Sequence, residues 1–128
     1  MKKFAVLLII CFTGTVQADR LPGPGQDVPK DPIKPYHTYT YENEWFAMDE
    51  TAEILVAARG KNPIDVKVYD QQGNLVVIGW NHAYIERDGI SMYTATWYVP
   101  GQRNGAIRYR IVLVNKTSFH IDFGISFK

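Results

Sequence analysis

The chain has 128 residues, with 14 basic and 13 acidic side chains and a single cysteine. This length is sufficient for one domain with a hydrophobic core. The nearly balanced charge argues against nucleic acid or an anionic membrane surface as the main partner. After the N-terminal segment, no apolar run approaches the ~20 residues of a membrane span. We therefore expect a small domain that does not bind nucleic acid and does not span a membrane.

The first 18 residues have the pattern of a secretory signal peptide. Lys2 and Lys3 form a basic start, residues 4–12 form an apolar run, and Ala18 ends a stretch with small side chains at the positions that a signal peptidase requires. We expect cleavage after Ala18 and export to the periplasm or to the outside of the cell. An uncleaved membrane anchor is the alternative.

The cysteine, Cys11, lies inside this signal. A lipoprotein signal would place a small residue before the cysteine, whereas Ile10 is bulky, so we expect no lipid attachment. The mature chain then contains no cysteine. Although export permits disulfides, the domain must be held together by its core alone.

Residues 19–37 are rich in proline and contain five of the seven prolines of the chain. Proline removes backbone donors and favours extended polyproline geometry, and the segment has no apolar periodicity. We expect a tether that leads to the domain without packing on it. A peptide gripped by a partner is the alternative.

The first half of the domain is predicted to consist of strands separated by turns. Residues 36–46 alternate and contain many β-formers. Residues 52–59 are apolar on both faces, which predicts a central strand or one covered on both sides. Residues 64–78 predict a hairpin of two strands, with Gly73 at a turn position where a positive φ costs little.

The second half contains one irregular segment among further strands. Residues 79–89 have no clear period and are predicted to form a long loop between strands. Residues 91–99 alternate again, with the side chains of Tyr93, Ala95, Trp97 and Val99 on one face. Residues 100–105 have the composition of a loop.

Residues 107–114 and 119–127 alternate most clearly, and residues 115–118 supply a turn between them. We predict that these two strands pair as an antiparallel hairpin with one large apolar face. The register would place Leu113 opposite Ile121, and a slip of one residue would expose five large side chains at about 2 kcal/mol each. Two further pairs follow in this register: Ile111 with Phe123, and Tyr109 with Ile125.

No segment has a convincing helical period. Short strands separated by turns in one small domain predict an all-β fold, namely a single antiparallel β-sandwich of the jelly-roll type with about seven to eight strands. We assign the sandwich to residues 38–128.

The order of motifs across the domain resembles that of the bacterial pre-peptidase C-terminal (PPC-like) domains. In that family a strand ends in a pattern similar to D-x-x-V-Y-D-x-x-G-N, and a later W-x-P precedes a Y-x-I-x-V-x-N strand. The resemblance covers most of residues 39–128. It is carried by four segments: 50–56, 65–75, 96–100 and 109–115.

The resemblance implies a jelly-roll-like β-sandwich of the kind appended to secreted peptidases, where it binds substrate or matrix. It also implies a calcium site in some relatives, held by clustered acidic residues. Here Lys67 stands where an acid is often found. We therefore expect no resident cofactor, and calcium remains the alternative, with Asp49, Asp65 and Asp70 as its candidate ligands.

The chain offers little for catalysis. The spacing of His37, His82 and His120 does not match a metal-ligand pattern such as H-x-x-x-H. The serines lie in strand or turn settings without the G-x-S-x-G elbow of a hydrolase. We therefore expect that the protein is not an enzyme. A small hydrolase or inhibitor is the least favoured alternative.

Two groups of residues are candidates for binding a partner. Trp80, His82 and Tyr84 lie in the irregular segment, where aromatic rings can stack on sugars or anchor a protein. Trp80 could instead close one end of the core. Arg108 and Arg110 share a strand face and could form, with Tyr98 and His120, a basic strip for an anionic ligand, or a surface ion pair of Arg110 with Asp122.

These observations predict an exported, non-enzymatic β-sandwich module that binds a protein or glycan partner in the cell envelope or outside the cell, and that is a monomer. The alternative is a calcium-stabilised structural accessory domain related to the appendages of secreted peptidases.

Overall fold

The structure, a computed structural model, describes residues 19–20 and 25–128. The predicted signal peptide and Cys11 lie outside these residues. The described residues form ten strands and no helix. In chain order the strands are β1 (Asp19–Arg20), β2 (Gly25–Asp27), β3 (Thr38–Ala47), β4 (Glu50–Arg59), β5 (Ile64–Tyr69), β6 (Leu75–Ile78), β7 (Trp80–Ile85), β8 (Ile90–Val99), β9 (Ala106–Asn115) and β10 (Phe123–Phe127).

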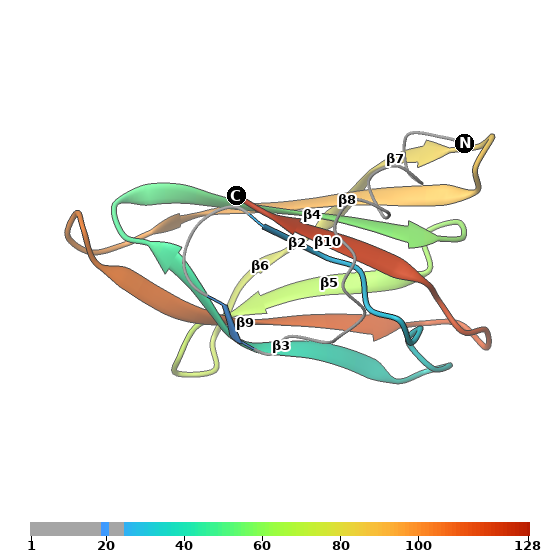
Figure 1. Cartoon of the computed structure of the whole chain (residues 1–128), viewed down its shortest axis with the longest axis horizontal. Helices are drawn as coiled ribbons and strands as arrows, with labels where there is room; N and C mark the ends of the chain where they lie inside the picture. Colours follow the sequence, from blue (N-terminus) through green and yellow to red (C-terminus); the bar gives the residue numbers. More distant parts are fainter. Residues whose placement is uncertain (1–18, 21–24) are drawn as a thin grey trace.

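The strands form two sheets of five that pack face to face (Figure 1). One sheet has the order β1-β3-β9-β5-β6, and we call it the first sheet. The second sheet has the order β2-β10-β4-β8-β7. All pairs are antiparallel except the short parallel pair of β1 with β3. The fold is therefore the all-β sandwich that the sequence predicts.

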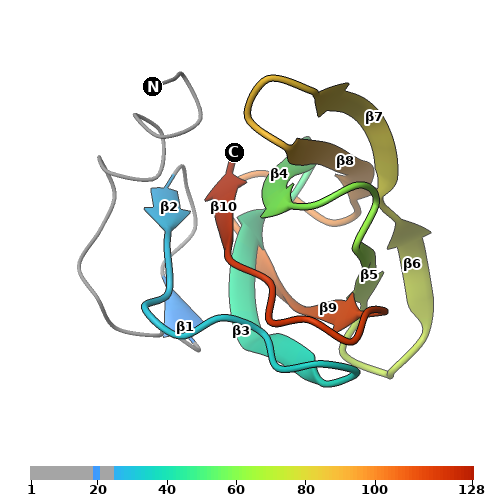
Figure 2. The ribbon, with the colours of Figure 1, turned by 90° about the vertical axis from the view of Figure 1, so that its right-hand side faces the viewer.

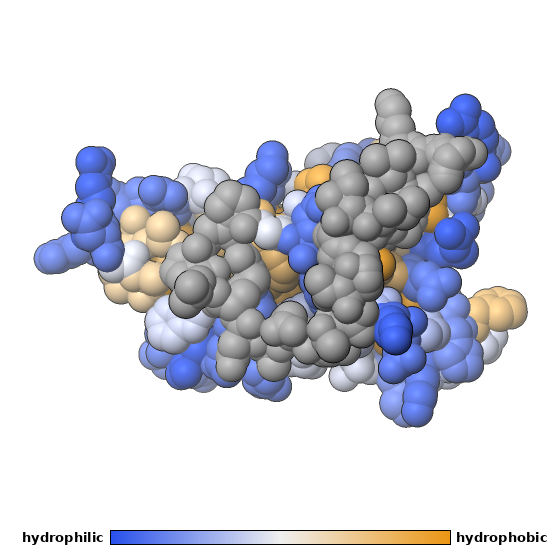
Figure 3. Space-filling model, in the orientation of Figure 1, coloured by the Kyte–Doolittle hydropathy of each residue, from blue (hydrophilic) through white to orange (hydrophobic). Residues whose placement is uncertain are grey.

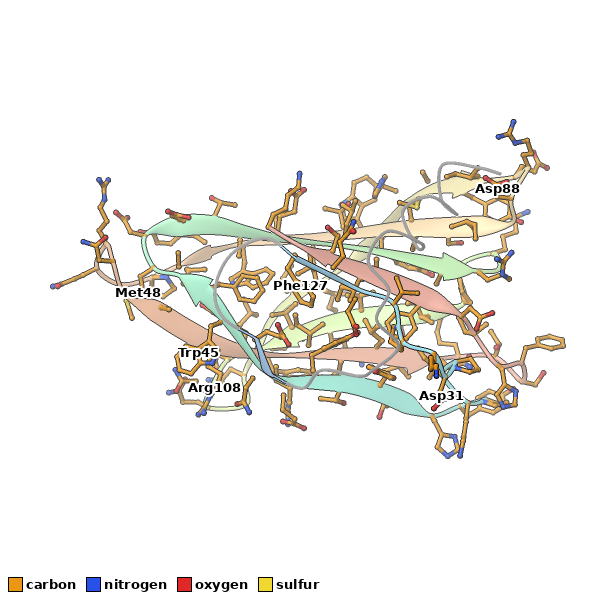
Figure 4. All side chains as sticks on the ribbon, in the orientation of Figure 1. Asp31, Trp45, Met48, Asp88, Arg108 and Phe127 are labelled. Atoms are coloured by element: carbon orange, nitrogen blue, oxygen red, sulfur yellow. The ribbon has the colours of Figure 1, made fainter. Side chains whose placement is uncertain are left out.

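The core fills the space between the sheets because alternate residues of each strand face inward. Phe127 of β10 points between the two layers (Figure 4). Aromatic rings from both sheets meet there edge to face, such as Phe46 with Trp97 at 5.0 Å between ring centroids. The buried strand residues of the core include Ile54, Val56, Val66, Val68, Tyr93, Ala95, Tyr109, Ile111, Leu113, Phe123 and Ile125.

Several predicted elements are confirmed. β4 lies between β10 and β8 at the centre of its sheet, as its two apolar faces indicate. The hairpin of residues 64–78 forms from β5 and β6, and Gly73 adopts a φ of 87° in its turn. In β8 the side chains of Tyr93, Ala95, Trp97 and Val99 are all buried.

The predicted pairing of residues 107–114 with residues 119–127 is wrong. β9 pairs with β3 and β5 in the first sheet, whereas β10 pairs with β4 and β2 in the second. The apolar faces of β9 and β10 therefore meet across the core and not within one sheet. Phe119, expected on the inward face, is 71% exposed in the connection between them. The alternation of apolar residues is compatible with a hairpin and with packing across the core. It shows which face of a strand is buried, but it does not show which strand is the hydrogen-bonded neighbour.

The predicted loop at residues 79–89 contains a strand. β7 pairs with β8 at the edge of the second sheet, and residues 86–89 make the turn. Most β7 side chains are exposed, because an edge strand has a neighbour on one side only. Without a buried face, the segment lacks the period of two that identifies a strand.

The predicted tether does not hold for residues 25–37. β2 pairs with β10, and Ile33 forms an isolated bridge with Ile121 and is only 2% exposed. Asp27 on β2 is also buried and accepts a hydrogen bond from the Tyr41 hydroxyl at 2.6 Å. Prolines are compatible with this packing because β2 itself contains none and the rest of the segment forms few backbone hydrogen bonds. The segment therefore belongs to the domain.

Candidate functional site

The five sequence-predicted partner-binding residues lie on two different sheets. Trp80, His82 and Tyr84 belong to β7 at the edge of the second sheet. Arg108 and Arg110 belong to β9 in the first sheet. The structure therefore separates the two candidate groups and gives each its own surroundings.

Trp80 lies on the outer face of the second sheet. It is paired with Thr94, whose neighbours Tyr93 and Ala95 point into the core. The indole is 64% exposed. The His82 ring contacts it in a T-shaped arrangement at 5.6 Å, and His82 Nδ1 is 2.9 Å from the hydroxyl of Thr94. These contacts orient the indole while they leave most of it in water, so it does not close the core.

Tyr84 does not share this surface. A β-bulge between Asn81 and Ala83 shifts the register of β7. After the bulge, Tyr84 is paired with Ser91, which faces inward. The ammonium of Lys61 lies over the Tyr84 ring at 5.5 Å. Because paired residues point to the same side of a sheet, Tyr84 and Trp80 point to opposite sides.

The chain crosses from the first sheet to the second between β6 and β7, along one lateral edge of the sandwich (Figure 2). Gly79 makes the crossing, and its amide donates to the carbonyl of Val66 at 2.8 Å. Next to it on β6, Leu75 is 49% exposed and Ile78 is 54% exposed. Together with Trp80 they give this edge an apolar character.

Arg108 and Arg110 lie on the outer face of the first sheet, because Tyr109 between them is buried. The guanidinium of Arg108 lies over the Trp45 ring at 5.8 Å, and that of Arg110 lies over the Tyr69 ring at 5.0 Å. Figure 4 shows Trp45 and Arg108 side by side on this outer face. Each arginine is thus held by an aromatic residue of a neighbouring strand.

A polar pocket of about 230 Å³ surrounds the two arginines at the tip of the β5–β6 hairpin. We call it the arginine pocket. Asp70 holds the turn beside it, since its Oδ1 accepts the amides of Gln72 and Asn74 at 3.0 and 2.9 Å. The pocket is lined by Glu42, Asn43, Asp70, Gln71, Gly73, Arg108, Tyr109 and Arg110. It therefore offers cationic, anionic and amide groups within one small space.

A second hollow of about 330 Å³ lies on the other side of the same turn. It shares Asp70, Gln71 and Tyr109 with the arginine pocket. Its other lining residues are Gln72, Val76, Tyr98, Pro100 and Ile107. The hydroxyl of Tyr98 donates to Asp49 at 2.7 Å, and this hydrogen bond raises the pKa of the tyrosine. The end of the sandwich by the β8–β9 loop is covered by hydrophilic side chains, at the far left of Figure 3.

Tyr98, His120 and Asp122 are predicted from the sequence to lie beside Arg108 and Arg110, and this prediction is partly wrong. Tyr98 lies in the hollow that adjoins the arginine pocket, but His120 lies after β9, in the connection to β10. Asp122 also lies in this connection, where its carbonyl accepts the amide of Arg59 at 3.0 Å. It therefore does not lie diagonally across a strand pair from Arg110. Both errors follow from the wrong pairing of β9 with β10.

The three candidate calcium ligands lie in different places. Asp49 accepts from Tyr98, Asp65 is 3.2 Å from the ammonium of Lys116, and Asp70 holds the hairpin turn. In the part of the chain that the structure describes, no three His, Cys, Asp or Glu side chains form a group that could hold a metal ion.

The polar groups considered for catalysis have structural partners. Ser91 donates to the carbonyl of Gly60 at 2.6 Å and accepts the amide of Asn62 at 2.7 Å. Nearby, the Tyr93 hydroxyl accepts the amide of Ile64, and burial raises the pKa of Tyr93 to about 12. His37 is 2.8 Å from the carbonyl of Pro35. These contacts hold the β4–β5 connection and the approach to β3.

Sequence reasoning missed Trp45 and Tyr69, whose rings hold the two arginines, and Glu42, which lines the arginine pocket. Their contribution depends on which strands flank β9, and that information is absent from the alternation itself. The bulge in β3 between Tyr41 and Glu44 also shifts the face on which Glu42 and Asn43 lie. The sequence contains one indication of this site: Tyr69 directly precedes the turn residue Asp70, so it lies at the same end of the predicted hairpin.

No helix in the described residues has the length and apolar character of a membrane span. No family model matches the sequence, and no curated protein sequence matches it either.

Solved structures with a similar arrangement of strands do exist. The pre-peptidase C-terminal domain of collagenase from Bacillus anthracis matches with 9% identity and a TM-score of 0.49, over 91% of this chain and 100% of that chain. The module CsCBM6-3 from Clostridium stercorarium, determined in complex with cellobiose, matches with 16% identity and a TM-score of 0.43, over 74% of this chain and 66% of that chain. A cyclase from Fischerella sp. TAU matches with 13% identity and a TM-score of 0.42, over 80% of this chain and 54% of that chain.

The first of these structures is a domain of the kind that the sequence motifs resemble. At these identities the likeness concerns the fold, and no residue role is carried from them to this chain.

Proposed function

We propose that this chain is an exported, non-enzymatic β-sandwich module that binds a glycan. The observation that carries the proposal is the indole of Trp80, which is 64% exposed and held in place by His82. Exposure of a single aromatic ring is common on protein surfaces, but a ring that a neighbouring side chain holds in place loses little conformational freedom when it stacks on a ligand. A flat ring of this kind can stack on the apolar face of a sugar, and Thr94 and His82 supply hydrogen-bonding groups beside it.

Export is supported by the signal-peptide pattern of residues 1–18. The non-enzymatic role is supported by the structural partners of Ser91, whose hydroxyl is engaged by the backbone of Gly60 and Asn62. The proposed location is the periplasm or the outside of the cell.

A glycan array probed with residues 19–128 tests the proposal. We expect binding to a defined set of neutral glycans, and we expect the Trp80→Ala variant to bind them at least ten times more weakly. Phe119→Ala is the matched control, because Phe119 is also an exposed aromatic residue and lies in the β9–β10 connection. No signal from any neutral glycan, or equal binding of these glycans by Trp80→Ala and wild type, would contradict the proposal.

A protein partner is the second candidate, and the exposed Leu75 and Ile78 of the edge strand β6 favour it. An edge strand can accept a strand of another chain through its free backbone groups. Pull-down from envelope extracts with wild type and with a Leu75→Ser/Ile78→Ser variant separates this candidate from the glycan proposal. Capture of one protein by the wild type but not by the variant would favour the protein partner.

A further inference from the structure

The arginine pocket is lined by two arginines that form no direct ion pair with a carboxylate of the described residues. Ion pairs within the described residues use Arg87, Arg103, Lys116 and Lys128, and none uses Arg108 or Arg110. In addition, Nε of Arg110 is shielded from water and has no hydrogen-bond partner among these residues. A buried donor without a partner costs roughly 1–3 kcal/mol, so the fold itself does not satisfy the Arg110 guanidinium, and the arginine side chains that line the pocket remain available to an anionic ligand.

The aromatic rings of Trp45 and Tyr69 fix the planes of these guanidinium groups. A fixed guanidinium presents its N–H groups as a rigid fork, which matches the two oxygens of a carboxylate or phosphate. The packing also lowers the side-chain entropy that binding would otherwise cost. The two arginines are thus prepared for an anionic group.

The acidic lining residues narrow the class of ligand. Glu42 and Asp70 line the same pocket, together with the amides of Asn43 and Gln71. Their negative charge opposes a small, multiply charged anion such as phosphate. Their oxygens, however, accept hydrogen bonds from hydroxyl groups, as the amide oxygens do. A ligand with one carboxylate and several hydroxyls complements both the arginines and these acceptor groups.

The dimensions fit a sugar acid. At about 230 Å³ the pocket lies below the ~300–1,000 Å³ of sites for drug-sized molecules, so it accommodates a single small ring. The adjoining hollow of about 330 Å³ carries the exposed ring of Tyr98 and gives room for the next unit of a chain.

We infer that the arginine pocket binds a sugar acid, whose carboxylate is held by Arg108 and Arg110 and whose hydroxyls are held by Glu42, Asn43 and Gln71. The site lies on a different sheet from Trp80, so it is a second binding site and does not depend on the first.

Titration with D-glucuronate and with D-glucose tests the inference, because the two share a ring and differ in the carboxylate. The readout is the nuclear magnetic resonance signals of the Arg108 and Arg110 Nε–H groups and of the Trp45 indole N–H, recorded on residues 19–128 at constant ionic strength. We expect saturable shifts of these signals with glucuronate and shifts at least ten times smaller with glucose. Equal shifts with the two sugars, or none with either, would overturn the inference.

Sodium acetate and inorganic phosphate form the second arm. We expect both to bind at least ten times more weakly than glucuronate, since they lack hydroxyls for the acidic and amide groups. Equal binding by acetate or phosphate would show a simple anion site and would overturn the sugar-acid assignment.

The Arg108→Lys/Arg110→Lys variant keeps both positive charges but removes the planar guanidinium groups. We expect its affinity for glucuronate, measured from the Trp45 indole N–H signal, to be at least ten times lower. Arg103→Lys is the control, because Arg103 lies in the exposed β8–β9 loop. Unchanged affinity in the double variant would overturn the inference. Trp80→Ala should bind glucuronate as tightly as the wild type does in this titration. If the same variant loses binding on the glycan array, the two sites are separate.

Discussion

Asn115, at the end of β9, joins three segments through one buried side chain. Its Nδ2 lies 3.0, 3.1 and 2.7 Å from the carbonyl oxygens of Ile33, Lys34 and Phe119, to which it donates. Its Oδ1 accepts the amide and the hydroxyl of Thr117, each at 2.8 Å. The side chain thus ties the N-terminal segment and the β9–β10 connection to the first sheet. The sequence predicts only a turn at this position.

We expect Asn115→Ala to lower the free energy of unfolding by about 2–4 kcal/mol, because several buried backbone groups lose their partners. Urea unfolding followed by tryptophan fluorescence measures the change. Lys116→Ala, at the neighbouring exposed position, is the control and should cost less than about 1 kcal/mol. A cost for Asn115→Ala as small as that of the control would contradict the role given to this side chain.

Asp27 is a second residue whose surroundings have a measurable consequence. Burial raises the pKa of Asp27 above its usual value of 3.8, while the hydrogen bond from Tyr41 opposes this rise. The folded chain then holds this proton more tightly than the unfolded chain does. The contribution of Asp27 to the free energy of unfolding is therefore greatest below pH 3.8, and it is lost as the pH rises through the raised pKa of the folded chain.

Replacing Asp27 with Asn removes this contribution. As the pH rises from about 3.5 to 7, the wild type loses the stability that the protonated Asp27 contributes, whereas Asp27→Asn does not. We therefore expect the free energy of unfolding of Asp27→Asn minus that of wild type to increase over this range. Urea unfolding at several pH values measures the difference. Asp31→Asn, at an exposed site in the same segment, should not reproduce the trend. A difference for Asp27→Asn that stays constant over this range would contradict the assigned shift.

The crossing between β6 and β7 depends on the absence of a side chain at Gly79. A Cβ atom there would lie 2.9 Å from Cβ and 3.1 Å from Cγ1 of Val66, which is fully buried on β5. These atoms cannot move away without disturbing the core. The glycine therefore allows the chain to pass close to β5 as it changes sheets.

We expect Gly79→Ala to destabilise the protein by about 1–3 kcal/mol through this overpacking. Gly73→Asn is the control, because a Cβ at Gly73 meets nothing within 4 Å and asparagine tolerates its positive φ. Thermal unfolding compares the two variants. Equal melting temperatures for Gly79→Ala and wild type would show that the crossing does not require a glycine.

β2 and the segment that follows it close the second sheet. Removal of residues 19–37 would break the β2–β10 pairing, expose the site of Ile33 and leave Asn115 without two of its acceptors. We expect residues 38–128 to be less stable than residues 19–128 by at least about 3 kcal/mol. Urea unfolding of both lengths measures this. Equal stability would support an unpacked tether.

The elements show which features the sequence could predict. Strands with one buried face, such as β5, β8 and β9, are identified by their alternation. β7 is not, since an edge strand exposes most of its side chains. The partner of β9 is not predictable either, because Tyr109, Ile111 and Leu113 would be buried against β10 in a hairpin or across the core. The packing of Ile33 depends on a distant bridge to Ile121 that no local pattern contains.

At the scale of the whole molecule, the sandwich presents two separate candidate surfaces. The Trp80 surface lies on the second sheet, and the arginine pocket lies on the first sheet at the tip of the β5–β6 hairpin. Trp80 could be selected from the sequence because it lies in a segment without a regular period, and Arg108 and Arg110 because they share the polar face of a predicted strand. Their separation, and the opposite orientation of Tyr84, depend on sheet order and on the β7 bulge, which only the folded chain defines.

The most direct test of glycan binding at Trp80 is native gel electrophoresis of residues 19–128 through gels that contain neutral polysaccharides, which lack the carboxylate that the arginine pocket requires. We predict slower migration of the wild type and of Phe119→Ala in at least one polysaccharide, and normal migration of Trp80→Ala. All three proteins should migrate alike in gels without polysaccharide. Unretarded migration of the folded wild type in every gel, or equal retardation of Trp80→Ala and wild type, would contradict the central claim.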